Sequence, residues 1–258
     1  MTGAFPLVFA LGSLASLLWL ALSGPAAAGI VARVDAGLSA LAGGLIGARA
    51  GFVLVHLAYY AARPAESLQF WQGGLSAIGG AVGAVIGLGL YCLATRQAFW
   101  PLADALAIPV TIMGLASWSG CLLDGCAYGR RASLGWLTPP APDMFGTYAP
   151  RLPTQAAGAL YSLAVLAFLQ RLHGQRRLPG WDVCLSVALV FAGSLALAFT
   201  RGDPSPSLAG LRLDGLGAGV SLALALAALG TRVWSNRSLR KPYAASDAGP
   251  GSDQHPSG

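Results

Sequence analysis

The sequence predicts an all-α polytopic membrane protein, a bundle of seven transmembrane helices with a small outer (periplasmic) loop region. Of its 258 residues, 10% are charged and 55% belong to the hydrophobic class. A soluble globular protein carries about 25% charged residues, so a soluble fold of this composition would lack the polar side chains to cover its surface. Disordered chains combine low hydrophobicity with high charge, which excludes that class too.

Seven apolar runs approach the length of about 20 residues that crosses the hydrocarbon core of a bilayer. Residues 24–28 after the first run resemble a signal-peptide cleavage site, but no positive charge precedes Arg33, so we expect an uncleaved helix. The last run begins with Arg212 and Asp214 near its start. The predicted spans are 5–23, 38–60, 73–95, 100–122, 155–172, 180–200 and 212–231.

These spans form one predicted transmembrane helical domain, residues 1–234, with its main outer loop at about 123–154. Residues 235–258 are rich in Ser, Gly, Pro and Asp and predict a disordered cytoplasmic tail. Basic residues favour the cytoplasmic side of a membrane. An N-terminus outside and a C-terminus inside agree best with this rule, because nine basic residues then lie inside and six outside. The inner set is Arg33, Arg96, Arg171, Arg176, Arg177, Arg232, Arg237, Arg240 and Lys241, and the outer set is Arg63, Arg130, Arg131, Arg151, Arg201 and Arg212.

The net charge of +6 does not indicate a nucleic-acid partner. Basic patches attract phosphate backbones when they are clustered, whereas these arginines stand at the ends of apolar segments. We therefore expect a membrane-embedded protein that binds no nucleic acid. Cys92 and Cys184 fall within apolar runs and are expected to be small buried apolar residues.

Glycines are spaced regularly in the third predicted span. Gly79, Gly83 and Gly87 place bare backbone on one helix face, which predicts close packing against another helix. Gly73 and Gly74 precede that stripe, weaken the start of the helix and could offer backbone N–H groups to a phosphate.

Arg49 lies near the middle of the second predicted span, preceded by a long apolar stretch. An ionisable side chain at that depth is costly and needs a partner or a cavity. One interpretation is a structural ion pair with Asp104 in the fourth span. The other is an anion site for a molecule that enters from the lipid, since the guanidinium fork suits phosphate oxygens.

The outer loop region is the expected seat of chemistry. Cys121, Asp124, Cys126 and Arg130 open it, and Arg151 and Gln155 close it. No nearby His or further Cys completes a tetrahedral set around the two cysteines, so we expect no metal site, whereas a disulfide between them stays open. Arg201 adds a third arginine group at the outer end of the sixth span. Three such groups on one membrane face would suit an anionic lipid headgroup, and the alternative is that they only bind interfacial lipid and cap helix ends.

The order of these motifs resembles the prolipoprotein diacylglyceryl transferase family over most of residues 5–232. The matching segments are Gly44-Leu-Ile-Gly47-Ala-Arg49, Trp71-Gln-Gly-Gly-Leu-Ser76, Ala103-Asp104, Gly120 to Arg130, Arg151-Leu-Pro-Thr-Gln155 and Arg201-Gly-Asp203. The resemblance implies seven helices, an outward N-terminus and the bacterial cytoplasmic (inner) membrane. It also implies transfer of the diacylglyceryl group of phosphatidylglycerol to the lipobox cysteine in the signal peptide of a preprolipoprotein, without a metal or soluble cofactor.

The chain departs from the family pattern at several positions. Ile78 stands where the family has its histidine, and Ser117 to Cys121 replace a family Gly-Arg-x-Gly-Asn. Asp124-Gly125-Cys126 stands where the family has Asn-Gly-Glu, and of the charged residues of the sixth span only Arg201 is kept.

The reaction needs a thiolate, positive charge at the phosphate and a dry site open to lipid. A free thiol is already a few per cent ionised at neutral pH, so a missing base slows the reaction without forbidding it. We expect Arg49 and Arg151 to bind the lipid phosphate, with Gly73, Gly74, Arg130 and Arg201 assisting, and Asp124 to act as the base. Two alternatives remain: a non-catalytic lipid-binding relative, and a different membrane transferase that uses Cys121 or Cys126 as its nucleophile.

Overall fold

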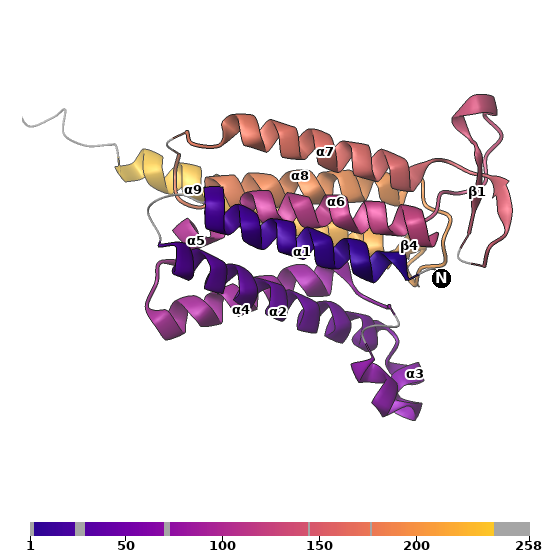
Figure 1. Ribbon diagram of the computed structural model, residues 1–258, viewed down its shortest axis with the longest axis horizontal. Helices are drawn as coiled ribbons and strands as arrows, with labels where there is room; N and C mark the ends of the chain where they lie inside the picture. Colours follow the sequence, from indigo (N-terminus) through magenta and orange to yellow (C-terminus); the bar gives the residue numbers. More distant parts are fainter. Residues whose placement is uncertain (1–2, 24–28, 70–72, 144, 176, 240–258) are drawn as a thin grey trace, which may run out of the picture.

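Most of the described chain folds into long helices that run roughly parallel to one axis (Figure 1). The computed structural model describes residues 3–23, 29–69, 73–143, 145–175 and 177–239. Six of its helices are long and apolar enough to cross a membrane, which makes the chain a polytopic helical membrane protein. They are α1 (Ala4–Ser23), α2 (Ile30–Val55), α4 (Ala77–Thr95), α6 (Ala107–Asp124), α8 (Trp181–Ala198) and α9 (Leu213–Leu239).

The fifth predicted span is α7 (Thr154–Leu172), a helix of 19 residues that runs beside α6 and α8 (Figure 1). It is less apolar than the six because Gln155, Gln170 and Arg171 lie within it. Its length is sufficient for a span, but its composition sets it apart from the other long helices.

Two predicted spans are interrupted in the structure. The span predicted at 38–60 ends at Val55, after which the chain turns at His56 into the short helix α3 (Leu57–Ala62) and a 3₁₀ turn, η1 (Pro64–Leu68). The span predicted at 100–122 is divided at Leu106 into α5 (Phe99–Ala105) and α6. Pro109 accounts for this division, because proline has no N–H to donate to the carbonyl of residue 105.

The other boundaries move by a few residues. The span predicted at 73–95 begins as a helix only at Ala77, so Gly73 and Gly74 lie in the preceding connection. Helix α9 continues to Leu239, which makes residues 235–239 helical where the sequence predicted a tail. Residues 240–258 of that tail, the cleavage-like segment 24–28 and Trp71 lie outside the described residues.

The remaining elements are two short hairpins and one turn. Strand β1 (Pro140–Pro142) pairs antiparallel with β2 (Tyr148–Pro150), with Ala141 opposite Ala149. Strand β3 (Ser207–Leu208) pairs with β4 (Leu211–Arg212), and η3 (Gly135–Leu137) precedes β1. Figure 1 shows the N-terminus, α3, β1 and β4 at one end of the bundle, and the end of α9 and α5 at the other.

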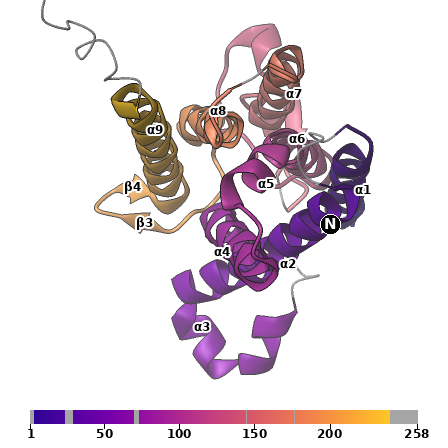
Figure 2. The same cartoon turned by 90° about the vertical axis from the view of Figure 1, so that its left-hand side faces the viewer.

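Helices α2 and α4 pack closely through small residues, as the glycine spacing predicts. A Cβ added at Gly83 would lie 2.9 Å from the Cα of Gly47 and would strike the carbonyl oxygen of Gly43. Gly79 and Gly87 meet the α2 backbone in the same way. Small residues at both surfaces let the two backbones approach, which is how helices associate in a bilayer. Figure 2, viewed along the bundle, shows α2 and α4 side by side, with the other long helices on one flank.

Large apolar side chains cover the outside of the bundle. Leu22, Leu93 and Leu224 are 82%, 78% and 66% exposed, each on a different helix. The buried core is small and is centred on Leu20, Leu88 and Leu102. An apolar exterior of this extent suits a lipid environment.

Candidate active site

The predicted site residues, apart from Asp104, lie toward the end of the bundle that holds the N-terminus (Figure 1). The connections at this end are residues 56–76 between α2 and α4, residues 125–153 between α6 and α7, and residues 199–212 between α8 and α9. The loop predicted at about 123–154 is therefore one of three segments that build this end. Asp104 lies in α5 at the far end, where its carboxylate accepts hydrogen bonds from the backbone N–H groups of Gly180 and Val183 at the start of α8. The predicted Asp104–Arg49 ion pair is wrong, because Arg49 has other partners.

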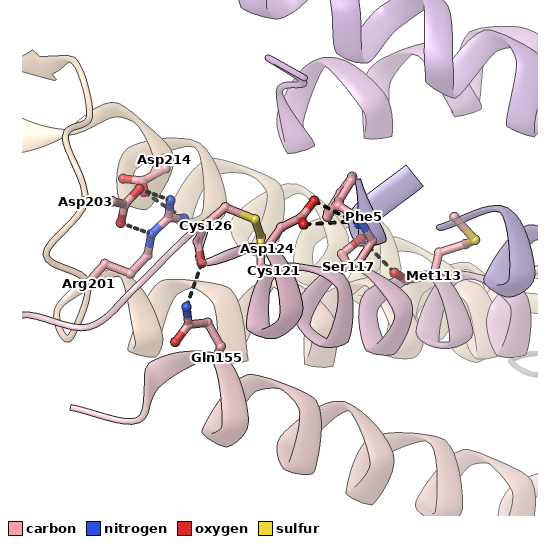
Figure 3. Close-up of a disulfide and its surroundings, with 11 residues drawn as sticks. Phe5, Met113, Ser117, Cys121, Asp124, Cys126, Gln155, Arg201, Asp203 and Asp214 are labelled. Carbon is pink, nitrogen blue, oxygen red and sulfur yellow. Dashed lines mark hydrogen bonds and ion pairs between the residues drawn. A yellow bond between two sulfur atoms is a disulfide. The ribbon is translucent and has the colours of Figure 1, made fainter. Parts of the chain in front are cut away.

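Cys121 and Cys126 form a disulfide across the turn that ends α6 (Figure 3). Gly125 within this turn has a positive φ of 73°, and Ala127 just after it has a φ of 51°. The carbonyl oxygen of Cys126 accepts a hydrogen bond from Nε2 of Gln155 at 2.9 Å. The disulfide and Gln155 thus fix the turn to the ends of α6 and α7.

Asp124 is buried and caps the first helix. Its two carboxylate oxygens accept hydrogen bonds from the backbone N–H groups of Ala4 at 3.2 Å and Phe5 at 3.0 Å (Figure 3). A carboxylate at a helix N-terminus is favoured by the unpaired N–H groups and by the helix dipole. These contacts stabilise the ionised carboxylate, and they join α6 to α1.

Arg151 is buried in the connection between α6 and α7, with 4% of its surface exposed. Its NH2 group donates to Oδ2 of Asp143 at 2.9 Å, and its guanidinium carbon lies 4.6 Å from the centre of the Tyr128 ring. Its Nε is buried without a hydrogen-bond partner among the described residues. Arg151 also forms a backbone bridge with Arg131, so this guanidinium is held between the hairpin and the 125–131 segment.

Asp143 connects Arg151 to the β1–β2 turn. Besides Arg151, its carboxylate accepts hydrogen bonds from the backbone N–H groups of Phe145 and Thr147, both at 2.9 Å. The pKa of the Asp143 carboxyl lies below its usual range. The largest cause is the hydrogen bond from the Thr147 N–H, and the Phe145 N–H and the positive charges of Arg151 and Arg131 add to it, whereas desolvation opposes them.

Arg201 belongs to a network of two arginines and two aspartates. Its Nε and NH2 groups donate to both oxygens of Asp203, and its NH1 group lies 3.0 Å from Oδ2 of Asp214 (Figure 3). Arg212 donates to Oδ1 of Asp203 at 3.3 Å and to Oδ2 of Asp214 at 3.0 Å. Two positive charges therefore meet two negative charges, where the β3–β4 hairpin joins α8 to α9.

Arg49 is enclosed by backbone carbonyl groups. It donates to the carbonyl oxygens of Glu66 at 2.6 Å and Ser67 at 2.8 Å, and to those of Gly73 at 2.7 Å and Gly74 at 3.2 Å. The two glycines, with φ values of 89° and 75°, thus turn their carbonyl groups toward this guanidinium. A buried arginine with four such bonds fixes the connection between α3 and α4 to α2.

The remaining two positions of interest are Arg130 and Ile78. Arg130 is exposed, and its backbone N–H and C=O groups bond the backbones of Thr200 and Leu152. Ile78, which stands where the family histidine is expected, packs against Gly217 on α9.

Of the four arginines predicted for the lipid phosphate, Arg49, Arg151 and Arg201 share an end of the bundle with the exposed Arg130, but these three have no side-chain partner in common within the described ranges. Among the described residues, Arg49 bonds carbonyl groups, Arg151 bonds Asp143, and Arg201 bonds Asp203 and Asp214. Sequence reasoning did not single out Asp143, Tyr128 or Asp214. Asp214 could have been found from its position two residues after Arg212. Nothing in the sequence indicates that Tyr128 lies next to Arg151. Within the described part of the chain, no group of three or more His, Cys, Asp or Glu side chains could hold a metal ion.

The fold and the contacts at this end define a polytopic helical membrane protein with two buried arginines, Arg49 and Arg151, toward one end of the bundle. The family model described as prolipoprotein diacylglyceryl transferase matches residues 4–234, which include every described helix except the last turn of α9. The chain belongs to this family.

The chain is also similar to curated prolipoprotein diacylglyceryl transferases over most of their length. The chain is 27% identical to the phosphatidylglycerol–prolipoprotein diacylglyceryl transferase of Rhizobium meliloti, over 83% of this chain and 77% of the relative. It is 32% identical to that of Nitratidesulfovibrio vulgaris, over 74% and 71%. It is also 32% identical to that of Cupriavidus necator, over 78% and 74%. The family resemblance inferred from the motifs is therefore confirmed.

Proposed function

We propose that this protein is a phosphatidylglycerol–prolipoprotein diacylglyceryl transferase of a bacterial inner membrane. The observation that carries the proposal is the family match over residues 4–234, which spans the bundle and all three connections at its N-terminal end. In the reaction, the thiol sulfur of the lipobox cysteine bonds to the glyceryl carbon of the lipid. The C–O bond to the phosphate breaks, its electron pair leaves with glycerol phosphate, and the thiol proton passes to a base.

The leaving phosphate needs positive charge, and the proposal assigns this task first to Arg151. Its guanidinium is buried, so its field is weakly screened, and one donor, Nε, has no partner in the part of the chain that the structure describes. Arg130 is exposed on the adjoining segment and could approach a headgroup directly. Asp124 remains the proposed base, although both its oxygens also cap α1.

Arg49 and Arg201 need a revised role within this proposal. Direct phosphate contact by Arg49 would break four hydrogen bonds to carbonyl groups, and contact by Arg201 would displace two carboxylates. Both changes are costly for a buried cation. We assign both residues to positioning: Arg49 holds the 66–74 connection that includes Gly73 and Gly74, and Arg201 holds the start of α9.

We also propose seven spans, which are the six apolar helices and α7. The N-terminus then lies outside and the C-terminus inside. The distribution of basic residues supports this orientation. A second support comes from the cysteines: the bonded pair lies at the N-terminal end, whereas the free cysteines Cys92 and Cys184 lie in α4 and α8 near the other end. Disulfides form in oxidising compartments, which supports an outer position for the N-terminal end.

The test is a purified-protein assay in phosphatidylglycerol vesicles with a lipobox peptide. Mass spectrometry should find the peptide cysteine carrying a thioether-linked diacylglyceryl group. Arg151→Ala should lower the rate at least about 100-fold, because it removes charge at the leaving group. Arg171→Ala, an exposed arginine at the other end of the bundle, is the matched control and should leave the rate unchanged.

Two outcomes would favour other functions. Absence of product from a folded protein that still binds phosphatidylglycerol would indicate a non-catalytic lipid-binding relative. Loss of all activity in Cys126→Ser, with Arg151→Ala fully active, would indicate a transferase that uses a cysteine nucleophile. In the structure both sulfurs are bonded to each other, so that mechanism would first require reduction of the disulfide.

A further inference from the structure

The Cys121–Cys126 disulfide joins the last turn of α6 to the segment that follows it. Its surroundings show what the link holds. Figure 3 places the disulfide between Asp124, the capping residue of α1, and the side chains of Gln155 and Arg201.

Residues 126–130, which start at the disulfide, contact both Arg151 and Arg201. The Tyr128 ring lies under the Arg151 guanidinium at 4.6 Å, and the backbone carbonyl of Tyr128 accepts a hydrogen bond from the N–H of Gly202 at 2.8 Å. Gly129 forms a backbone bridge with Arg201 itself. Displacement of residues 126–130 would therefore move the surface under Arg151 and the backbone beside Arg201 together.

One residue of this segment has an unfavourable backbone conformation. Ala127 has a positive φ of 51°, which is unfavourable for a residue with a Cβ, and Gly125 is also left-handed. Such a conformation persists only where the surroundings impose it. The disulfide and the Gln155 hydrogen bond both restrain Cys126, just before Ala127, and the Gly202 N–H holds the carbonyl of Tyr128, just after it.

We propose that the Cys121–Cys126 disulfide is a positioning element of the transferase site, which keeps Tyr128 under Arg151 and Gly129 beside Arg201, and that its reduction lowers the rate of transfer. A dithiol reduces it in two exchange steps: the two protein thiols gain two electrons and two protons, and the dithiol becomes a disulfide. Cys121 and Cys126 are both partly exposed, so a dithiol has access to them. This inference rests on the proposed transferase function.

The experiment compares the oxidised and reduced forms of one preparation. Purified protein in phosphatidylglycerol vesicles is equilibrated with dithiothreitol at graded ratios of its reduced and oxidised forms. Each sample is assayed with the lipobox peptide and also labelled with a maleimide to count free thiols at Cys121 and Cys126. We expect kcat to fall at least tenfold, and the midpoint potential of this fall should equal that of the thiol labelling. Reoxidation of the protein should restore kcat. A purely structural role would instead lower thermal stability and leave kcat of the folded protein unchanged.

The chain supplies its own matched variants. Cys92→Ala/Cys184→Ala removes the two buried free cysteines and should respond to dithiothreitol like the parent protein. Cys121→Ser/Cys126→Ser should have the activity of the reduced parent and no response to dithiothreitol. If this double variant does not fold, the redox titration of the parent protein decides the matter alone.

Amide exchange gives a readout that does not depend on activity. Reduction should speed exchange at Arg130 and Gly202, whose N–H groups are bonded to the carbonyls of Thr200 and Tyr128. Unchanged kcat with full thiol labelling would overturn the proposal, as would unchanged exchange at these amides. A protein inactive in both states, with exchange that still responds, would instead count against the transferase function.

Discussion

At the scale of single residues, three arginines near the N-terminal end of the bundle, two buried and one partly buried, each satisfy their charge differently. Arg49 bonds neutral carbonyl groups, Arg151 shares one carboxylate and an aromatic ring, and Arg201 is matched by two carboxylates. The sequence identified all three as side chains that packing does not explain. It could not identify their partners, since Asp143 and the carbonyl groups around Arg49 are brought near only by the folded connections.

Arg49→Ala should destabilise the protein more than any exposed arginine substitution. It leaves four carbonyl groups without a charged donor, and removing a buried charged partner costs about 3–5 kcal/mol of unfolding free energy. Thermal unfolding in detergent measures the change. Arg63→Ala is the control, because Arg63 is half exposed and its ion pair with Glu66 is long, at 3.8 Å, so about 1 kcal/mol or less is expected. Equal effects of the two substitutions would show that Arg49 is not the anchor of the 66–74 connection.

The Asp143 contacts should resist mild acid. The folded protein lowers the pKa of this carboxyl, so its ionised form contributes stability above the unfolded value of about 3.9, and that contribution is lost only as the pH falls through the lower folded value. Amide exchange at Phe145 and Thr147, corrected for the intrinsic pH dependence, should therefore be constant between about pH 7 and pH 4. Asp143→Asn should speed this exchange at every pH and lower the transfer rate. A loss of protection near pH 6 would contradict the assignment.

At the scale of elements, the packing of α2 against α4 depends on backbone contact. The spacing of Gly79, Gly83 and Gly87 predicted a close partner, and the structure identifies it as α2, with Gly43 and Gly47 opposite. Hydropathy shows no break at His56 or Leu106, because both lie within apolar sequence. Helix α2 runs from Ile30 to Val55, shifted toward the N-terminus of the span predicted at 38–60, and the division at Leu106 has its sequence signal in Pro109.

Gly83→Leu should separate these helices and lower the melting temperature strongly, because even a Cβ meets the Gly43 carbonyl and lies 2.9 Å from the Cα of Gly47. Gly89→Ala on the same helix is the matched control. Nothing lies within 4 Å of a Cβ at Gly89, and alanine favours a helix over glycine by about 1 kcal/mol, so stability should be unchanged or higher. Circular-dichroism melting in detergent compares the two. Similar melting temperatures would mean that α2 and α4 tolerate a wider separation than the structure shows.

At the scale of the whole molecule, the two ends of the bundle differ in their contents. The N-terminal end holds both hairpins, the disulfide and the contacts of Arg49, Arg151 and Arg201, whereas the other end holds the short helix α5 and the contact of the buried Arg33 with the Leu20 carbonyl. A membrane enzyme with this asymmetry is expected to work at the face where those elements gather.

The orientation can be tested with two single cysteines. Ser207→Cys places a thiol on the exposed β3 strand, and Gln97→Cys places one on the exposed connection between α4 and α5. A membrane-impermeant maleimide should label Ser207→Cys in intact spheroplasts and Gln97→Cys only after permeabilisation. The parent protein is the background control, since its free cysteines Cys92 and Cys184 are buried. The reverse labelling pattern would invert the proposed topology.

Composition and motif order by themselves determined the membrane class, most of the long helices and the family. These properties depend on local hydrophobicity and on residue identities along the chain, which a single sequence displays in full. Only the tertiary structure decided that Arg49 bonds carbonyl groups and not Asp104, that Cys121 and Cys126 are joined, and that Tyr128 lies under Arg151. The physical reason is that hydrogen bonds and ion pairs act over a few ångströms, and the partners at that range are set by how separate connections fold together at the end of the bundle.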